Sequence, residues 1–446
     1  MPALSLRQSS SLLVSVLATL ALAFALGLVL DHVRQPTAST VVERAVVPDR
    51  RSQGERAVET AQKGLATRPD DPRALAALAQ AYLLRARESG DPGYYSRADA
   101  LLGRALAAQP DDIEATLAAG SLALTRHEFE TALELGRRAV QLAPYTSAGH
   151  GVLTDALVEL GRYDEAVEAA QKMVDLRPDL ASYSRVAYLR ELYGDLDGAV
   201  EAMRDAVKSG APSGEATAWT EVQLGHLLFA QGNPDGAERA YNSAMRRLDN
   251  YAYGMAGLAR VRAARGDLNG AAGLYERAAQ ILPLPEFVIA LGDTYTRLGD
   301  TARAEQQYAL VGAMQKLLAA NGVRTDLELA LFNADRGTNL DEALQAAHTE
   351  YGLRRSVQVA DTLAWVEYRR GELPAALKHS HEALRLGTRD PLMLYHAGVI
   401  AQANGEPDRA RELLAASSEL NPKFSILWSE DLATRLRQLS VEGGQP

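Results

Sequence analysis

The side chains that could carry out catalysis form no recognised catalytic motif in this sequence. Its 446 residues contain no Walker-type phosphate loop, no G-x-S-x-G nucleophile elbow and no H-E-x-x-H motif. Cysteine does not occur, which excludes disulfides, thiol catalysis and thiolate metal ligands. The sequence therefore predicts a protein that is not an enzyme, with no catalytic, cofactor-binding or metal-binding residues.

Two short stretches contain residue types that metal ions favour, and both have a simpler explanation. The stretch Asp195-Leu196-Asp197-Gly198 begins like a calcium-binding loop, but the later ligands are missing and we expect a turn between two helices. His379 and His381 are two residues apart on an expected helix, about 200° around its axis, so they cannot share one metal ion. We expect both histidines at the surface or in a groove.

A set of aromatic and arginine side chains indicates binding rather than catalysis. These residues lie on one side of a series of expected helices, roughly 140° from the apolar seam of each helix. Small polar side chains would suffice there in a simple scaffold, whereas large aromatic residues and arginine dominate binding hot spots. The predicted binding residues are Tyr188, Trp219, His226, Phe229, Tyr253, Arg260, Arg297, Trp365, Tyr368, Arg369 and Tyr395.

Helical hairpins are the elements that must position these side chains. In residues 147–179, apolar residues recur with helical spacing, Gly161 and Tyr163 interrupt the pattern, and Pro178 ends the second helix. Pro110, Pro144 and Pro178 lie 34 residues apart, a period typical of stacked supersecondary units. Two short helices cannot bury both of their faces alone, so each hairpin must pack against its neighbours.

Small residues recur at two places in each hairpin. Alanine is expected where the two helices approach too closely for a larger side chain, at Ala132, Ala166, Ala199, Ala237, Ala271, Ala304, Ala343, Ala376 and Ala410. Glycine is expected to supply the left-handed conformation that ends the first helix, at Gly161, Gly194, Gly232, Gly266, Gly299, Gly371 and Gly405. His127 replaces the turn glycine in one hairpin.

Period, turn glycine, following aromatic residue or leucine, small residue and terminal proline together resemble the tetratricopeptide repeat family. The fullest matches are Leu291, Gly292, Tyr295, Gly299, Ala304 and Tyr308, and Leu224, Gly225, Gly232, Ala237, Tyr241 and Ala244. The resemblance covers residues 55–422, about ten hairpins after a lone second helix. It implies an all-α fold, a right-handed superhelical solenoid of antiparallel helix hairpins whose first helices line a concave groove.

This resemblance implies that the groove binds another protein. The predicted binding residues would face the groove and hold an extended peptide or a helix of a partner protein. The alternative is that several of these rings pack against the first helix of the next hairpin. A net charge of −10 argues against a nucleic-acid partner, because phosphate binding needs a basic stripe.

An uncharged stretch near the start of the chain predicts a membrane anchor. Residues 12–30 contain no charged side chain, and as a helix they would span about 28 Å, close to the bilayer core. We expect a single-pass membrane protein with a short tail (1–11), an anchor (12–30), a linker (31–54) and an extracytoplasmic solenoid. The alternatives for residues 12–30 are a signal peptide, cleaved on export, and a buried helix.

Two irregularities stand out in the second half of the array. The helix that contains Tyr308 is expected to continue to a stop at Asn321-Gly322, well past the usual end. At the far end, apolar residues at helical spacing predict a capping helix within residues 423–446: Phe424, Leu427, Trp428, Leu432, Leu436 and Leu439.

Together these features favour a non-enzymatic protein-binding scaffold or adaptor tethered to a membrane. One alternative is an accessory subunit of an envelope assembly machine, in polysaccharide export, outer-membrane biogenesis or cytochrome maturation. Another alternative is a substrate-processing or ligand-binding subunit of an enzyme complex.

Overall fold

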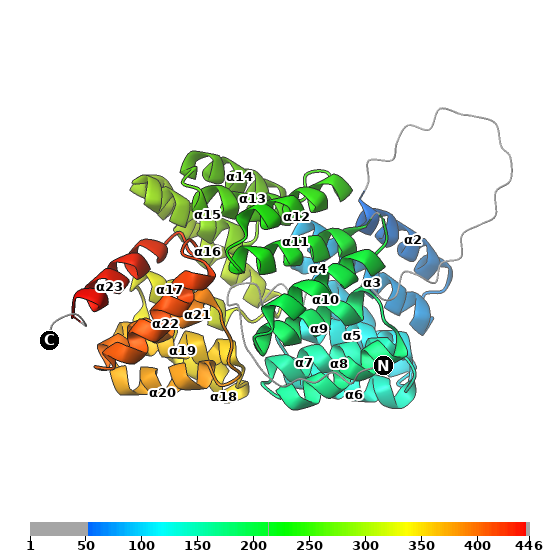
Figure 1. Ribbon diagram of the computed structural model, residues 1–446. Helices are drawn as coiled ribbons and strands as arrows, with labels where there is room; N and C mark the ends of the chain where they lie inside the picture. The colour runs from blue at the N-terminus through cyan, green and yellow to red at the C-terminus, as the bar shows by residue number, and fades with distance from the viewer. Residues whose placement is uncertain (1–51, 213, 443–446) are drawn as a thin grey trace.

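The computed structural model describes residues 52–212 and 214–442, and in these ranges the chain forms helices joined by loops, without a strand. Helix α2 (Gln53–Thr67) comes first, and ten helix hairpins follow it in the described residues (Figure 1). The hairpins are α3 (Pro72–Ser89) with α4 (Gly93–Ala108), α5 (Ile113–Thr125) with α6 (Phe129–Leu142), α7 (Ser147–Glu159) with α8 (Tyr163–Leu176), α9 (Leu180–Leu192) with α10 (Leu196–Ser209), α11 (Glu215–Ala230) with α12 (Pro234–Arg247), α13 (Ala252–Ala264) with α14 (Leu268–Ile281), α15 (Pro285–Leu298) with α16 (Thr301–Ala320), α17 (Asp326–Arg336) with α18 (Leu340–Leu353), α19 (Val357–Arg370) with α20 (Leu373–Ala383), and α21 (Pro391–Ala403) with α22 (Pro407–Leu420). Helix α23 (Ser429–Glu442) ends the array. The predicted all-α repeat solenoid is therefore confirmed.

The small residues of the repeat have the roles that the sequence predicts. All seven predicted turn glycines have positive φ, between 71° and 87°, and His127 adopts the same left-handed conformation with φ 60°. The nine repeat alanines are at most 2% exposed. Asp195 caps α10 by accepting a hydrogen bond from the Gly198 N–H at 2.9 Å, so this stretch is the expected turn.

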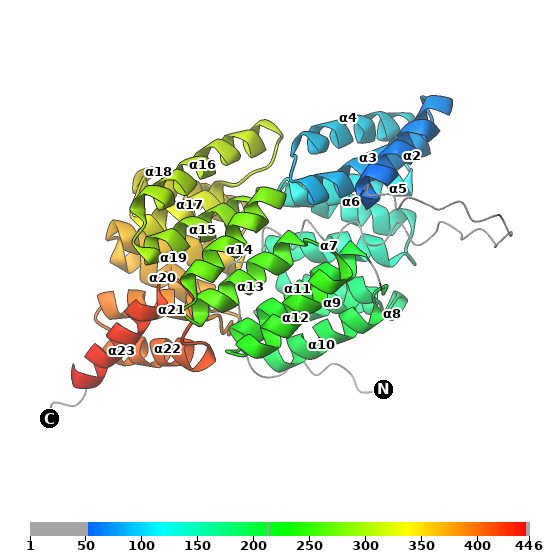
Figure 2. The ribbon, with the colours of Figure 1, turned by 90° about the horizontal axis from the view of Figure 1, so that it is seen from above.

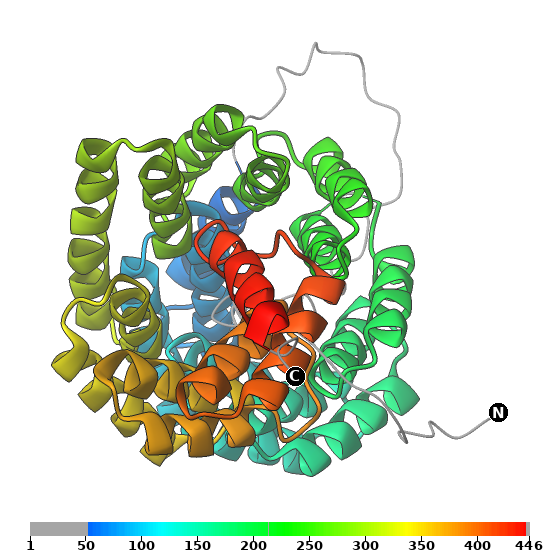
Figure 3. The ribbon, with the colours of Figure 1, turned by 60° about the vertical axis from the view of Figure 1, so that its left-hand side comes forward.

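The hairpins wind around a central axis for more than one superhelical turn (Figure 3). Hydrogen bonds join residues that are more than 190 positions apart. The Val357 N–H donates to the Tyr163 hydroxyl at 2.8 Å, and the Thr388 hydroxyl donates to the Leu192 carbonyl at 2.8 Å. The Asn421 amide donates to the Phe229 carbonyl at 2.7 Å. The later hairpins therefore lie directly on the earlier ones, and we call this contact the inter-turn seam.

A buried ion-pair network holds the seam at its centre. Arg354 is 6% exposed; its Nη1 lies 2.5 Å from Glu159 Oε2 on α7, and its Nε lies 2.8 Å from Glu350 Oε2 on α18. The Arg354 guanidinium also lies over the Phe129 ring, 4.7 Å from its centroid. Burial raises the pKa of Glu159 to about 7, although the nearby Arg354 opposes this shift.

The long second helix of the seventh hairpin reaches the first superhelical turn. Helix α16 runs to Ala320, and its C-cap is Asn321, which confirms the predicted stop. The Ser96 hydroxyl donates to Asn321 Oδ1 at 3.1 Å, and the Arg324 N–H donates to the Arg126 carbonyl at 3.3 Å. Figure 2 shows α16 beside α4, which supports this contact between distant segments.

The ends of the array differ in part from the sequence predictions. Phe424 and Trp428 lie in an irregular segment rather than in the predicted helix, because α23 begins only at Ser429. Leu432 and Leu439 on α23 are at most 1% exposed. The predicted tail and anchor, and nearly all of the linker, lie outside the described residues. Among the described helices, none is both long enough and apolar enough to cross a bilayer.

Candidate functional site

The inner wall of the superhelix borders a cavity of about 460 Å³. Most of its lining comes from the first helices of the hairpins, including α3, α11, α13, α15, α17 and α19. A second cavity of about 460 Å³ lies between these helices and the segment 421–430. The two cavities meet, since they share Arg260, Tyr275, Ala290, Asp293, Asp335 and Leu392.

Some of the predicted binding residues border these cavities. Trp219, His226, Tyr253 and Arg260 line the first cavity, and Phe229, Arg260 and Arg297 line the second. His226 Nδ1 lies 2.8 Å from the Tyr241 hydroxyl, and burial lowers the pKa of His226 well below its usual value. This imidazole is therefore neutral, and Arg260 is the cation that this part of the wall presents.

Four other predicted binding residues form an aromatic cluster with the end of the chain. Trp365 and Tyr395 are each 1% exposed, and Trp365 stacks on His396 with ring centroids 4.1 Å apart. Tyr395 stacks on Trp428 at 5.7 Å, and Arg369 lies 5.8 Å from the Trp365 ring centroid. Tyr368 packs on Trp365 from the same helix. In this arrangement Trp365 and Tyr395 offer almost no surface to a partner.

The remaining predicted residue, Tyr188, lies at the inter-turn seam. Its hydroxyl accepts a hydrogen bond from Gln358 Nε2 on α19 at 3.4 Å. The sequence left open whether some of these rings pack against the first helix of the next hairpin. Tyr253 does so, because its ring centroid lies 5.6 Å from that of Phe287 on α15. The eleven residues are thus distributed over two cavities, one aromatic cluster and the seam.

Charged groups in the first cavity are only partly neutralised by one another. The lining contains five carboxylates, from Glu215, Glu286, Asp293, Glu328 and Asp335, and three guanidinium groups, from Arg87, Arg260 and Arg336. Arg87 pairs with Glu215 at 3.3 Å, and Arg336 pairs with Asp293. Asp335 accepts a hydrogen bond from Trp365 Nε1 at 3.0 Å. The lining thus has an excess of negative charge.

Burial shifts the acid–base properties of the cavity carboxylates. It raises the pKa of Glu286 to about 7, and the neighbouring Glu328 adds to this shift. It also raises the pKa of Glu328, while Arg354 opposes that shift. The pKa of Asp293 rises to about 6 because burial outweighs its pairing with Arg336. At neutral pH, the ionised forms of these acids are therefore destabilised by the low polarity around them.

The sequence did not indicate the polar end of this cavity. Glu286 follows Pro285 in the first turn of α15, where an acid is explained by the helix dipole alone. Gln315 lies on the extension of α16, and Glu328 lies on α17. These side chains border one cavity only because the superhelix curves, and no spacing in the sequence indicates that they would. The unusual length of α16 was the one feature of the sequence that pointed to this region.

Two histidines were expected at the surface or in a groove, and one of these predictions is wrong. His379 is 7% exposed, and its Nδ1 lies 2.7 Å from Glu367 Oε2 on the paired helix α19. It packs inside its hairpin because its side of α20 faces α19, whereas His381 is exposed. Across the described residues, no group of three or more His, Asp or Glu side chains could hold a metal ion.

Comparison with known proteins supports the repeat assignment. The tetratricopeptide repeat family model matches residues 84–146, 153–216, 222–284 and 362–423, which is more than half of the chain. The chain is 23% identical over 324 residues to the protein CTR9 homolog of Arabidopsis thaliana, covering 62% of this chain and 29% of that protein. It is 37% identical over 89 residues to tetratricopeptide repeat protein 36 of Mus musculus, covering 20% of this chain and 48% of that protein. The chain thus spans less than half the length of these relatives.

Two solved structures match this chain at low sequence identity and low TM-score. The structure of the APC/C hetero-tetramer Cut9-Hcn1 matches with a TM-score of 0.37 and 15% identity, over 87% of this chain and 93% of that chain. The yeast Tom70 structure matches with a TM-score of 0.36 and 12% identity, over 88% of this chain and 93% of that chain.

Proposed function

Since this chain belongs to the tetratricopeptide repeat family, we propose that it is a non-enzymatic scaffold that is tethered to a membrane through residues 12–30 and recruits a protein partner to its inner wall. The family supports protein binding in general. The uncharged stretch 12–30 supports the tether. The lining of the two joined cavities, to which the first helices contribute aromatic rings and arginines, supports recruitment to the inner wall.

The seam constrains how a partner enters. Because the second superhelical turn lies on the first, the part of the predicted concave groove that the first helices line is a cavity of limited volume. Each of the two joined cavities has a volume of about 460 Å³, which accommodates a few side chains and is too small for a whole helix. The proposed partner therefore inserts a short extended segment or a loop tip.

Affinity capture from detergent extracts, with the full chain as bait, tests the binding site. The test variant is Tyr253→Ala with Arg260→Ala, since both side chains line the first cavity. Tyr145→Ala is the matched control, because Tyr145 is 87% exposed and lies outside both cavities. We expect a partner that the wild type and the control retain and that the double variant loses. Equal retention by all three, with unchanged helix content by circular dichroism, would remove the inner wall from the proposal.

The tether and the side of the membrane need separate measurements. A chain that lacks residues 1–51 should leave the membrane fraction, and the full chain should stay in it until detergent is added. If the solenoid is extracytoplasmic, as proposed, external protease should digest it in cells whose cytoplasmic membrane is intact. Digestion only after that membrane is lysed would place the solenoid on the other side.

A further inference from the structure

The last part of the described chain crosses the inner wall of the superhelix. An irregular segment follows α22, and Figure 3 shows α23, in red, in front of the central axis. We call residues 422–431 the covering loop. Residues 423–430 of this loop line the second cavity, together with residues of α11, α13, α15 and α21. The covering loop therefore borders the joined cavities on one side.

Contacts of the covering loop extend well beyond the last hairpin. The rest of α23 caps that hairpin, because Arg435 donates to Gln402 Oε1 on α21 at 2.7 Å and Leu439 is fully buried. Glu430 of the loop instead pairs with Arg297 on α15, whose Nη1 lies 3.0 Å from Glu430 Oε2. Capping the last hairpin does not require this contact with a helix 133 positions earlier.

Four of the predicted binding residues contact the covering loop. The ring centroid of Trp428 lies 5.5 Å from that of Trp365 and 5.7 Å from that of Tyr395. The Arg369 guanidinium lies 5.9 Å from the Trp428 centroid. Arg297, paired with the loop as described above, is the fourth. The loop thus occupies a surface that the sequence assigned to a partner.

Two acidic residues of the loop complete this contact. The Tyr395 hydroxyl donates to Asp431 Oδ2 at 2.6 Å, and Glu430 pairs with Arg297. Both acids lie in the first turn of α23, where the helix dipole favours them, but their side chains also bind two other helices. The loop therefore presents a ring, followed two and three positions later by carboxylates, to an inner wall that offers rings, a guanidinium and a hydroxyl.

The covering loop is held less firmly than a core segment. Its large apolar side chains, at positions 424 and 426–428, are each only half-buried, and the second cavity borders all of them. The side chains of its ion pair are 36% exposed at Arg297 and 69% exposed at Glu430. Ion pairs this exposed contribute little to stability. Lifting the loop therefore costs less than removing a fully packed segment would.

We propose that the covering loop is an internal ligand of the inner wall and that a partner segment of the same chemistry displaces it. Such a segment carries an aromatic residue followed, two and three positions later, by acidic residues. Its ring packs on Trp365 and Tyr395, and its carboxylates bind Arg297 and the Tyr395 hydroxyl. This rests on the proposed function, because it names the partner chemistry for the same inner wall.

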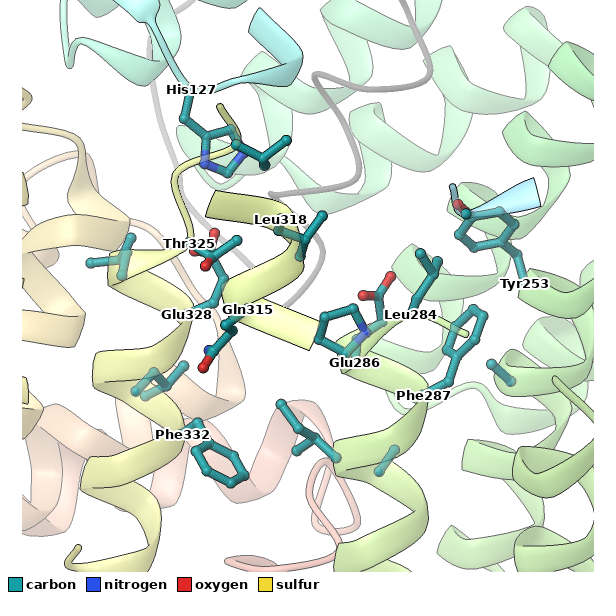
Figure 4. Close-up of a pocket in the computed structure, with 18 of the residues that line it drawn as sticks. His127, Tyr253, Leu284, Glu286, Phe287, Gln315, Leu318, Thr325, Glu328 and Phe332 are labelled. Atoms are coloured by element: carbon teal, nitrogen blue, oxygen red, sulfur yellow. The ribbon is translucent and has the colours of Figure 1, made fainter. Parts of the chain in front are cut away.

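The first cavity allows such a partner to compete with the loop. A tethered loop has a high effective concentration at its own site, so a partner needs contacts that the loop lacks. Figure 4 shows the apolar side chains of Leu284, Phe287, Leu318 and Phe332 around the first cavity. No residue of the covering loop, which the structure describes in full, lines this cavity. Because the two cavities meet, an apolar side chain beside the partner's motif can be buried there, which favours the partner.

Fluorescence anisotropy with a dye-labelled peptide of the loop's own sequence tests the proposal. The peptide is NPKFSILWSEDL, residues 421–432, and the protein is the purified full chain in detergent. The double variant Phe424→Ala with Trp428→Ala removes both rings from the loop, so it should bind the peptide at least tenfold more tightly than the wild type does. Val441→Ala changes a side chain of α23 that is 70% exposed; it is the matched control and should bind the peptide like the wild type.

A second variant loosens the loop without changing a buried side chain. Glu430→Arg places a cation opposite Arg297 and should raise the peptide affinity up to about fivefold, as expected for the loss of an exposed pair. Glu412→Arg breaks an exposed pair with Arg409 away from both cavities and should leave the affinity unchanged. A peptide with Glu430→Arg should bind the double variant up to about fivefold more weakly, and adding Arg297→Glu to that variant should restore the affinity.

The outcomes separate this proposal from the proposed function. Equal peptide affinity for the wild type, the double variant and Glu430→Arg, all folded by circular dichroism, overturns the internal ligand, and so does equal binding of a scrambled peptide. If the double variant does not fold, the Glu430→Arg variant decides alone. The assay uses no partner, so peptide binding without any captured partner contradicts only the proposed function. A captured partner without peptide binding contradicts only the internal ligand.

Discussion

Replacing Gly161 by alanine should open the inter-turn seam, whereas the same change at Gly266 should not. Both glycines end the first helix of a hairpin in the left-handed conformation, with φ 76° at Gly161 and 87° at Gly266. A Cβ atom at Gly161 would lie 2.3 Å from the Arg355 carbonyl oxygen, whereas one at Gly266 would meet nothing within 4 Å. The two substitutions share the backbone strain and differ in the clash across the seam.

The expected magnitudes follow from these two terms. The left-handed conformation costs an alanine about 1–2 kcal/mol at either position. Overpacking adds about 1–3 kcal/mol at Gly161 alone, because the atom in the way belongs to the backbone and cannot rotate aside. We therefore expect a loss of unfolding free energy of about 1–2 kcal/mol for Gly266→Ala and about 2–5 kcal/mol for Gly161→Ala.

Urea denaturation followed by circular dichroism measures the stability, and small-angle X-ray scattering measures the shape. Gly161→Ala should increase the radius of gyration as the turns separate, and Gly266→Ala should leave it unchanged. Gly232→Ala provides a second site on the seam, since its Cβ atom would lie 2.4 Å from the Leu420 carbonyl oxygen. Equal losses of stability at all three positions, with no change in shape, would refute the seam as described.

Three further outcomes are expected. Arg354→Met should cost about 3–5 kcal/mol in urea denaturation because it leaves Glu159 buried without its partner and removes one of the two arginines that pair with Glu350, the other being Arg324. Arg409→Met, which breaks an exposed pair with Glu412, is the control and should cost less than about 1 kcal/mol. The folded-state pKa of Glu286, about 7, lies above the unfolded value, so the folded state binds the proton more tightly and stability falls as pH rises from about 4.5 to 7. Glu286→Gln should therefore be more stable than the wild type at pH 8, by no more than about 1 kcal/mol because Glu286 is exposed and solvent screens the effect. This advantage should shrink toward pH 5 in thermal denaturation, and a constant difference across this range would contradict the shift. Trp365→Ala should cost about 3–5 kcal/mol in urea denaturation because the ring is buried and Asp335 loses its indole donor, and a loss below about 1 kcal/mol would contradict the aromatic cluster.

The closed seam changes what this repeat array can bind. An open solenoid presents a continuous concave surface to a partner, as extended repeat proteins do. Here the Arg354 network and the backbone contacts at Gly161 and Gly232 bring the two turns together and leave a cavity. A ligand must therefore fit within a restricted space, which favours small groups or short segments over long surfaces.

The local rules of the repeat were readable from the sequence because they depend on near neighbours. Glycine at a left-handed turn and alanine at a close helix contact, such as Gly161 and Ala166, are required within a single hairpin. The period, the hairpin pairing and the extension of α16 were predicted for this reason.

Only the tertiary structure decided where the inner-wall residues go, because the curvature of a solenoid is the sum of small rotations between successive hairpins. That sum brings Arg354 onto Glu159, 195 residues earlier, and gathers Glu286, Gln315 and Glu328 from three different helices. It also allows the segment with Phe424 and Trp428 to pack irregularly on Tyr395, where helical spacing had predicted a helix. Each hairpin sequence specifies contacts with its neighbours, whereas the meeting of two turns is specified by all the hairpins between them.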